Sequence, residues 1–133
     1  MKRQNFSSGT PWETLAGYSR AVRVGQSVFV SGTTASDSAG QIQHPGDPYG
    51  QAIYIYQKID GALQAVGATL ADVVRTRVYV TDRGAIEQVI KAHHAVFQAI
   101  RPANTLVEVS GLAVPEMLVE IEVDAIVIEQ GEE

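Results

Sequence analysis

The chain has 133 residues, of which 45% are hydrophobic and 19% are charged, with a formal net charge of -5 at pH 7. This length and composition are typical of a globular unit with one buried core, so we predict a single domain over residues 1–133. Ten Lys and Arg residues are outnumbered by fifteen Asp and Glu residues, which argues against nucleic-acid binding, because phosphate recognition needs clustered positive charge. Since cysteine is absent, disulfides, thiolate metal sites and a cysteine nucleophile are excluded.

The N-terminal residues are mostly polar. Residues 1–14 contain Ser, Gly and Pro and no apolar targeting core, so they predict an arm whose order depends on docking against another surface. No stretch of the chain approaches the roughly 20 apolar residues that a membrane span requires. We therefore expect a cytoplasmic protein that does not associate with membranes.

The first regular elements predicted are a β-hairpin and a helix. Two runs of β-forming residues flank Gly25 and Gln26, a pair suited to a two-residue type II′ turn. Further along, Asp47 and Pro48 combine a helix N-cap with a proline at the first helical position, where its missing N–H costs nothing. Apolar residues then recur at spacings of three and four until Gly67, which predicts an amphipathic helix that ends there.

A strand and a second helix follow. The strand lies within residues 68–82, and alternation places Val74, Val78 and Val80 on one face, opposite Arg75, Arg77 and Tyr79. We expect Asp82 to cap the helix and Pro102 to end it. The apolar stripe predicted for this helix consists of Ile86, Ile90, His93, Phe97 and Ile100, and it is widened by Val89 and Val96.

Two more strands close the chain. Residues 101–112 alternate apolar and polar side chains, and so do residues 118–128, where Glu120, Glu122 and Asp124 separate the apolar positions. The predicted order is therefore β-β-α-β-α-β-β. This order indicates an α+β fold with one mixed sheet and both helices on the same face of it.

The other face of the predicted sheet has no helix to cover it. The residues expected there are Phe29, Ser31, Arg75, Arg77, Tyr79, Asn104, Leu106, Glu108, Glu120, Glu122 and Asp124. Such a face either lies in water with loosely paired charges or packs against other subunits in a closed ring, where charges find partners across the boundary. In a ring, the clefts between subunits would be natural sites for ligands.

Three stretches of the chain resemble a known family. They are GY at residues 17–18 with VFVSG at residues 28–32, GATLADVVRTRVYVTD at residues 67–82, and PANTLVEVSGL at residues 102–112 with VEIEVDAI at residues 119–126. Over residues 17–128 the chain resembles the Rid, or YjgF-type, family of reactive intermediate imine and enamine deaminases. The resemblance implies a chorismate-mutase-like α+β fold and a homotrimer packed sheet to sheet. It also implies clefts between subunits in which a small enamine or imine is hydrolysed to release ammonia, with neither a metal nor an organic cofactor.

The resemblance also implies roles for particular residues. Glu120 corresponds to the carboxylate that positions the hydrolytic water, and Tyr18 to a tyrosine of the cleft, so both are candidate catalytic residues. Ser31 and Gly32 correspond to a small segment whose backbone approaches the ligand, and Leu106 to a position that is often smaller. A carboxylate in a partly dry cleft would have its pKa raised, which makes it a better proton acceptor near neutral pH.

The chain departs from the family at residue 104. The family motif is P-A-R, whereas here Asn104 follows Pro102 and Ala103. In active members the arginine holds the substrate carboxylate, and alternation predicts Asn104 on the same sheet face as Glu120. Losing a charged bidentate contact costs about 2 to 4 kcal/mol, or roughly 30- to 1,000-fold in binding. Asn104 therefore argues against ordinary 2-iminoacids as substrates.

Other interpretations of these residues stay open. Glu120 also fits a charge pair at a subunit boundary, and Tyr18 also fits packing alone. Arg20, two residues beyond Tyr18, is the first candidate to replace the missing arginine, unless it is a solvated or boundary side chain. Arg77 and Arg101 are weaker candidates for the same task.

The positions of the histidines argue against a metal site, and the negative net charge argues against RNA cleavage. His93 and His94 do not predict a metal site, because adjacent side chains on a helix diverge by about 100°. The main hypothesis is hydrolytic deamination in intersubunit clefts. The alternative is a trimer that binds a small metabolite without turnover, as a sensor or accessory protein. RNA cleavage is disfavoured by the acidic charge.

Overall fold

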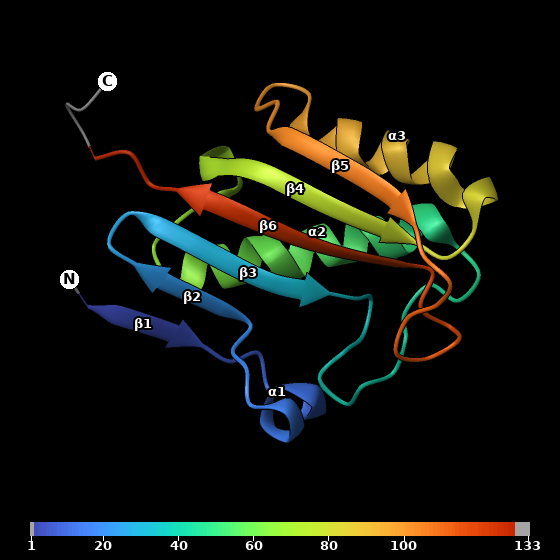
Figure 1. Cartoon of the computed structure of the whole chain (residues 1–133), viewed down its shortest axis with the longest axis horizontal. Helices are drawn as coiled ribbons and strands as arrows, with labels where there is room; N and C mark the ends of the chain where they lie inside the picture. Colours follow the sequence, from blue (N-terminus) through green and yellow to red (C-terminus); the bar gives the residue numbers. More distant parts are fainter. Residues whose placement is uncertain (1, 130–133) are drawn as a thin grey trace.

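Figure 1 shows the computed structural model of the chain, which describes residues 2–129. Six strands form one sheet in the order β1-β2-β3-β6-β4-β5, in which β4 and β5 pair in parallel and the other neighbours are antiparallel. The elements are β1 (Arg3–Phe6), α1 (Pro11–Ala16), β2 (Ala21–Val24), β3 (Ser27–Thr33), α2 (Pro48–Ala65), β4 (Val73–Val80), α3 (Ile86–Phe97), β5 (Ala103–Glu108) and β6 (Val119–Ile126). The two long helices α2 and α3 cover the same face of the sheet (Figure 1), which confirms the predicted two-layer α+β architecture.

The hairpin and the first long helix form as predicted. Gly25 has φ +62° in the turn between β2 and β3, and Gln26 is outside the left-handed region, as in a type II′ turn. At the start of α2, the Asp47 carboxylate accepts a hydrogen bond from the Gly50 backbone N–H at 2.9 Å. The helix ends at residue 65, and Gly67 follows with φ +84°.

The predicted N-terminal arm docks on its own chain. Residues 3–6 pair antiparallel with β2 and so form an edge strand of the sheet, and residues 11–16 form the short helix α1. The predicted element order lacks both. A strand of four residues and a helix of six are too short to show a hydrophobic period in the sequence.

Strand β4 contains a bulge that reverses the predicted orientation of its first residues. Val73 is buried, whereas Val74 is 44% exposed, so the expectation that Val74 shares a face with Val78 is wrong. The pairing of β4 with β6 shifts register between Val73 and Arg75. Because an extra residue in one strand changes which face the following side chains occupy, Thr76 becomes the next residue to point into the core.

Strand β5 presents Asn104, Leu106 and Glu108 to the helix side of the sheet. Asn104 is level with Thr76 in the parallel β4–β5 pair, and Leu106 is level with Val78. Paired residues of adjacent strands share a face, and Thr76 and Val78 are buried beneath the helices. The prediction that Asn104, Leu106 and Glu108 lie on the uncovered face is therefore wrong. Alternation defines two sets of side chains, but does not say which set faces the core when the strand lies at an edge.

The apolar stripe of α3 agrees with the prediction in part. Val89 and Phe97 are buried as predicted, and Ala92 is buried as well, whereas Ile90 is 53% exposed. Asp82 caps a 3-10 turn at Arg83–Ala85 that precedes α3, and its carboxylate accepts from the Gly84 N–H at 2.9 Å. Asp82 therefore caps this leading turn, and not α3 itself as the sequence predicted.

The uncovered sheet face pairs several of its charges within the chain. Arg77 Nη1 lies 3.3 Å from Glu122 Oε2 and 3.2 Å from Asp124 Oδ2. The Tyr79 hydroxyl donates to Glu122 Oε1 at 2.6 Å, and this hydrogen bond raises the pKa of Tyr79. Large apolar side chains remain exposed on the same face, namely Phe29, Val107 and Ile126.

Candidate functional site

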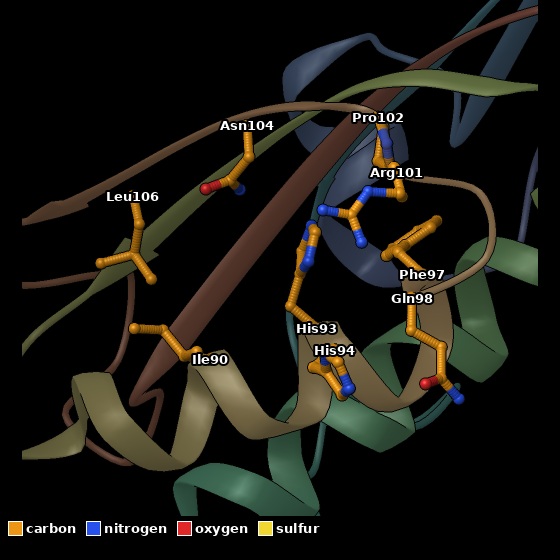
Figure 2. A pocket seen from close by; sticks show the side chains of 9 residues that line it. All are labelled: Ile90, His93, His94, Phe97, Gln98, Arg101, Pro102, Asn104 and Leu106. Atoms are coloured by element: carbon orange, nitrogen blue, oxygen red, sulfur yellow. The ribbon is translucent and has the colours of Figure 1, made fainter.

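The candidate residues lie in two separate hollows. The first, here called the Glu120 hollow, has a volume of about 210 Å³, and its lining includes Tyr18, Arg20, Gly32 and Glu120. The second, called the Asn104 hollow, has a volume of about 440 Å³ and lies between α3 and β5 (Figure 2). Its lining residues are Ile90, His93, His94, Phe97, Gln98, Arg101, Pro102, Asn104 and Leu106.

The Glu120 carboxylate lies directly against the backbone of β3. A Cβ atom added at Gly32 would lie 3.1 Å from Glu120 Cδ and would overlap one carboxylate oxygen. Burial raises the pKa of Glu120, the Arg20 guanidinium lowers it, and the neighbouring Glu122 raises it further. The net result is a raised pKa, as expected for a half-buried carboxyl group.

Gly32 is required for this close approach. We expect Gly32→Ala to displace the Glu120 carboxylate with little loss of stability, because the overlapping atoms belong to the flexible end of that side chain, and to slow ammonia release. Chemical denaturation measures the free energy of unfolding. Gly61→Ala is the matched control, because no atom lies within 4 Å of a Cβ added at Gly61. Ammonia release by Gly32→Ala as fast as that by Gly61→Ala would contradict the predicted displacement of Glu120.

Arg20 is buried behind Tyr18, and its donors are largely occupied. Nη1 donates to the Gly32 carbonyl at 2.6 Å and to Thr33 Oγ1 at 3.1 Å, and Nε lies 3.5 Å from Glu13 Oε2. Nη2 donates to the Tyr18 hydroxyl at 3.4 Å, and the guanidinium lies 5.5 Å from the centre of the Tyr18 ring. Arg20 therefore belongs to the Glu120 hollow and does not line the hollow that contains Asn104.

Glu13 is a buried carboxylate that the sequence reasoning missed. Its oxygens accept hydrogen bonds from Ser7 Oγ at 2.9 Å, from the Ser8 N–H at 3.1 Å and from Thr10 Oγ1 at 2.8 Å. Burial alone would raise its pKa, but these hydrogen bonds outweigh burial and lower the pKa of Glu13 to about 2. The ionised group faces Arg20 and ties α1 to the sheet. A signal was available, since Thr10 and Glu13 have the spacing of a capping box.

In the other hollow, a chain of hydrogen bonds fixes Asn104. Asn104 Nδ2 donates to Thr76 Oγ1 at 2.9 Å, and Thr76 Oγ1 lies 2.8 Å from His93 Nε2. Because the amide N–H only donates, the Thr76 hydroxyl proton is free to be donated to Nε2 of a neutral imidazole. Burial lowers the pKa of His93, which favours that neutral form. His93 therefore contributes a polar side chain to the lining of this hollow, whereas the sequence analysis placed it only in the apolar stripe of the helix.

Thr76 is the centre of this chain and is fully buried. We expect Thr76→Val to lower the free energy of unfolding by about 1 to 3 kcal/mol, because His93 and Asn104 both lose their partner. Thr76→Ser keeps the hydroxyl and is the control. The ¹⁵N chemical shifts of the His93 ring should report a changed tautomer in the valine variant alone. Identical histidine spectra in both variants would contradict the proposed hydrogen-bond chain.

Arg101 lines the Asn104 hollow from the end of α3. Its backbone N–H donates to the Phe97 carbonyl at 2.8 Å, and its φ of +58° is in the left-handed region. In Figure 2 the Arg101 side chain extends over the hollow toward the His93 ring. A cation therefore lies near Asn104, although it comes from residue 101.

The structure separates residues that the sequence reasoning put together. Tyr18, Arg20, Gly32 and Glu120 line one hollow, whereas Asn104 and Leu106 line the other. The expectation that Asn104 shares a sheet face with Glu120 is wrong, because β4 lies between β5 and β6 and β5 presents this residue to the helix layer. Ser31 lies beside Gly32, where its hydroxyl donates to the Ser19 carbonyl at 2.7 Å.

Within residues 2–129, no group of three or more His, Asp or Glu side chains is arranged to hold a metal ion. None of the described helices has the length and apolar character needed to cross a membrane.

By fold, the chain is a two-layer α+β protein of known type. It is similar to the crystal structure of Rv2704 from Mycobacterium tuberculosis, a member of the YjgF/YER057c/UK114 family. The TM-score is 0.85 and the sequence identity is 46%, over 95% of this chain and 100% of that chain. It is also similar to NMB1025 from Neisseria meningitidis, a member of the YjgF protein family, with a TM-score of 0.78, 27% identity and coverage of 97% and 98%. These similarities confirm the expected chorismate-mutase-like α+β fold.

Sequence comparison gives the family. The chain is 36% identical to the uncharacterised protein SCO2049 of Streptomyces coelicolor over 122 residues, which cover 92% of this chain and 90% of that protein. It is 31% identical to the RutC family protein PH0854 of Pyrococcus horikoshii over 123 residues, or 92% and 95% of the two chains. The model of the Endoribonuclease L-PSP family matches residues 10–127. The chain therefore belongs to this family, which is the Rid or YjgF-type family that the sequence resembles.

Proposed function

We propose that the protein binds a small imine or enamine in clefts between the subunits of a homotrimer and hydrolyses it to release ammonia. The observation that carries this proposal is the Glu120 hollow, where a half-buried carboxylate with a raised pKa lies beside Tyr18 and Arg20. Perturbed carboxylates in hollows are candidates for general bases. Membership of the Rid-type family supports the same reaction.

The trimer is supported by the separation of the two hollows. Glu120 lies on the uncovered sheet face and Asn104 lies on the helix side, so one cleft can use both only if they come from different copies of the chain. Three exposed apolar side chains on the uncovered face, Phe29, Val107 and Ile126, would be buried by packing sheet against sheet. Closing a ring in this way would set the Glu120 hollow of one copy beside the Asn104 hollow of the next.

The chemistry follows from the groups in the Glu120 hollow. The Glu120 carboxylate accepts a proton from water as the water oxygen bonds to the imine carbon. The electron pair of the C=N π bond moves to nitrogen, which takes the proton from Glu120 to give a carbinolamine. Glu120 then accepts the carbinolamine hydroxyl proton as the C=O bond forms, and this proton passes to the nitrogen, which leaves as ammonia when the C–N bond breaks. The Tyr18 hydroxyl orients the substrate, and Gly32 allows a ligand and Glu120 to approach the same stretch of backbone. The net reaction consumes only water.

The test is ammonia release by the purified wild-type protein. Imines generated in situ by an amino-acid oxidase, from neutral, acidic and basic amino acids, should be converted faster in its presence. Keto-acid and ammonia formation are both measured, with heat-denatured protein as the control. If none of these imines is hydrolysed faster, the deaminase proposal fails.

One observation favours a second function, metabolite binding without turnover. Residue 104 is an amide rather than the arginine of the family motif, and one of its N–H groups is already bound to Thr76. Under this alternative, a small metabolite should raise the melting temperature, because a ligand bound only to the native state stabilises it, while no ammonia is formed.

RNA cleavage, which the name of the family suggests, is not proposed for this chain. The net charge is -5, and acidic residues exceed basic ones by fifteen to ten. RNA binding depends on the attraction between phosphates and clustered Lys and Arg, so this charge balance opposes it.

A further inference from the structure

The chemical composition of the Asn104 hollow is unusual for this chain. The sequence holds fifteen Asp and Glu residues, yet none of the residues that line this hollow is acidic. Its polar wall consists of Asn104, Gln98 and two histidines, and its one permanently charged residue is Arg101. A hollow with a cation, neutral donors and no carboxylate favours a negatively charged ligand group.

The backbone at Arg101 is unusual for the residue that occupies it. A φ of +58° after a helix is a position where glycine is preferred, because side chains with a Cβ are strained there. The hydrogen bond from the Arg101 N–H to Phe97 needs only the backbone. Local folding therefore does not require an arginine at this position.

The Arg101 guanidinium forms no ion pair and no side-chain hydrogen bond with any of the described residues 2–129. Arg20 and Arg77, in contrast, are each held by carboxylates of the chain. Figure 2 shows the Arg101 side chain directed over the hollow, near His93 and Asn104. Burial lowers the pKa of His93, so at neutral pH the imidazole adds no second charge there.

We propose that Arg101 binds the carboxylate of a small ligand in the Asn104 hollow and thereby determines which ligands the site accepts. The planar guanidinium can donate two parallel hydrogen bonds to a carboxylate. The apolar side chains of Ile90, Phe97 and Leu106 line the same hollow and strengthen this ion pair by lowering the local dielectric constant. This inference rests on the proposed function only in assuming that a small molecule binds at this site.

The test compares a carboxylate with its neutral analogue. The probes are pyruvate and pyruvamide, and their dissociation constants are measured by calorimetry or NMR titration. Arg101→Gly should weaken pyruvate binding by about 30-fold or more while leaving pyruvamide binding unchanged, since only the anion loses a charged contact. The glycine suits the left-handed backbone, so the melting temperature should be unchanged or higher. Lys91→Gln removes one positive charge from the exposed side of α3 and is the control.

Each outcome decides one of the two proposals. Equal pyruvate binding by wild type and Arg101→Gly, or no pyruvate binding by wild type, overturns the role of Arg101. Pyruvate binding that depends on Arg101, in a protein that releases no ammonia from any imine, supports this role and overturns the deaminase proposal. Ammonia release by Arg101→Gly with the same KM as wild type supports the deaminase proposal and overturns the role of Arg101. If Lys91→Gln weakens pyruvate binding as much as Arg101→Gly does, the effect is one of overall charge and the proposed contact is wrong.

Discussion

Replacing Glu120 with glutamine should lower the kcat for ammonia release by at least about 100-fold, because general bases typically contribute a factor of this size. Glutamine has nearly the same shape and fits against Gly32, but it accepts no proton from water. The KM should change much less than kcat if the side chain acts on water and not on substrate binding. Single-turnover and steady-state rates with the best imine substrate measure both constants.

The pH dependence gives an independent check on Glu120. The base must be ionised to accept a proton, so activity should fall as the pH drops through its pKa. Burial raises that pKa, and the acidic limb of the rate profile should therefore lie above pH 4.5, the ordinary value for a glutamate. Glu116→Gln, on an exposed loop, is the control and should leave the profile unchanged. A Glu120→Gln variant with kcat within about 10-fold of wild type would rule out this carboxylate as the base.

Glu13→Ala should lower the free energy of unfolding at neutral pH by about 3 kcal/mol. A pKa lowered from 4.5 to about 2 in the folded state corresponds to about this stabilisation by the ionised form. Its removal also leaves the buried Arg20 guanidinium without its carboxylate, and breaking a buried ion pair typically costs about 3 to 5 kcal/mol. Urea denaturation of wild type and variant measures the difference. Thr14→Ala, on the exposed side of α1, should have little effect.

The stabilisation by Glu13 should disappear in acid. Because the pKa is lower in the folded than in the unfolded chain, the contribution is complete above pH 4.5 and is lost as the pH falls toward about 2. The difference in stability between wild type and Glu13→Ala should therefore shrink over this range. A difference that stays constant from pH 7 to about pH 2 would show that the carboxylate charge is not the cause.

Glu13 links the N-terminal residues to the candidate active site. It holds Arg20, Arg20 holds the Gly32 carbonyl, and Gly32 lies against Glu120. Three direct contacts therefore connect the N-terminal residues to the Glu120 carboxylate. The Glu13→Ala variant is expected to lose activity at temperatures where it is still folded, because the wall of the Glu120 hollow loses its support.

Sequence patterns alone determined most of the scaffold of this protein. The hairpin at Gly25, the cap at Asp47 and the alternation around Glu120 are local, since each depends on residues within one turn or one strand. The family motifs add the general topology, because they cover nearly the whole chain. These features are readable without coordinates because backbone geometry and hydrophobic period act over a few residues.

Only the tertiary structure decided which residues meet. The bulge at Val74, the placement of β4 between β5 and β6, and the hydrogen bond from Asn104 to Thr76 depend on pairing between distant segments. The partnership of Glu13 with Arg20 likewise needs the N-terminal residues to dock on the sheet. Alternation in a strand fixes two faces but not which one is covered, and a one-residue shift exchanges them. For this physical reason the sequence could identify the polar residues at Asn104 and Glu120, but could not place them in separate hollows.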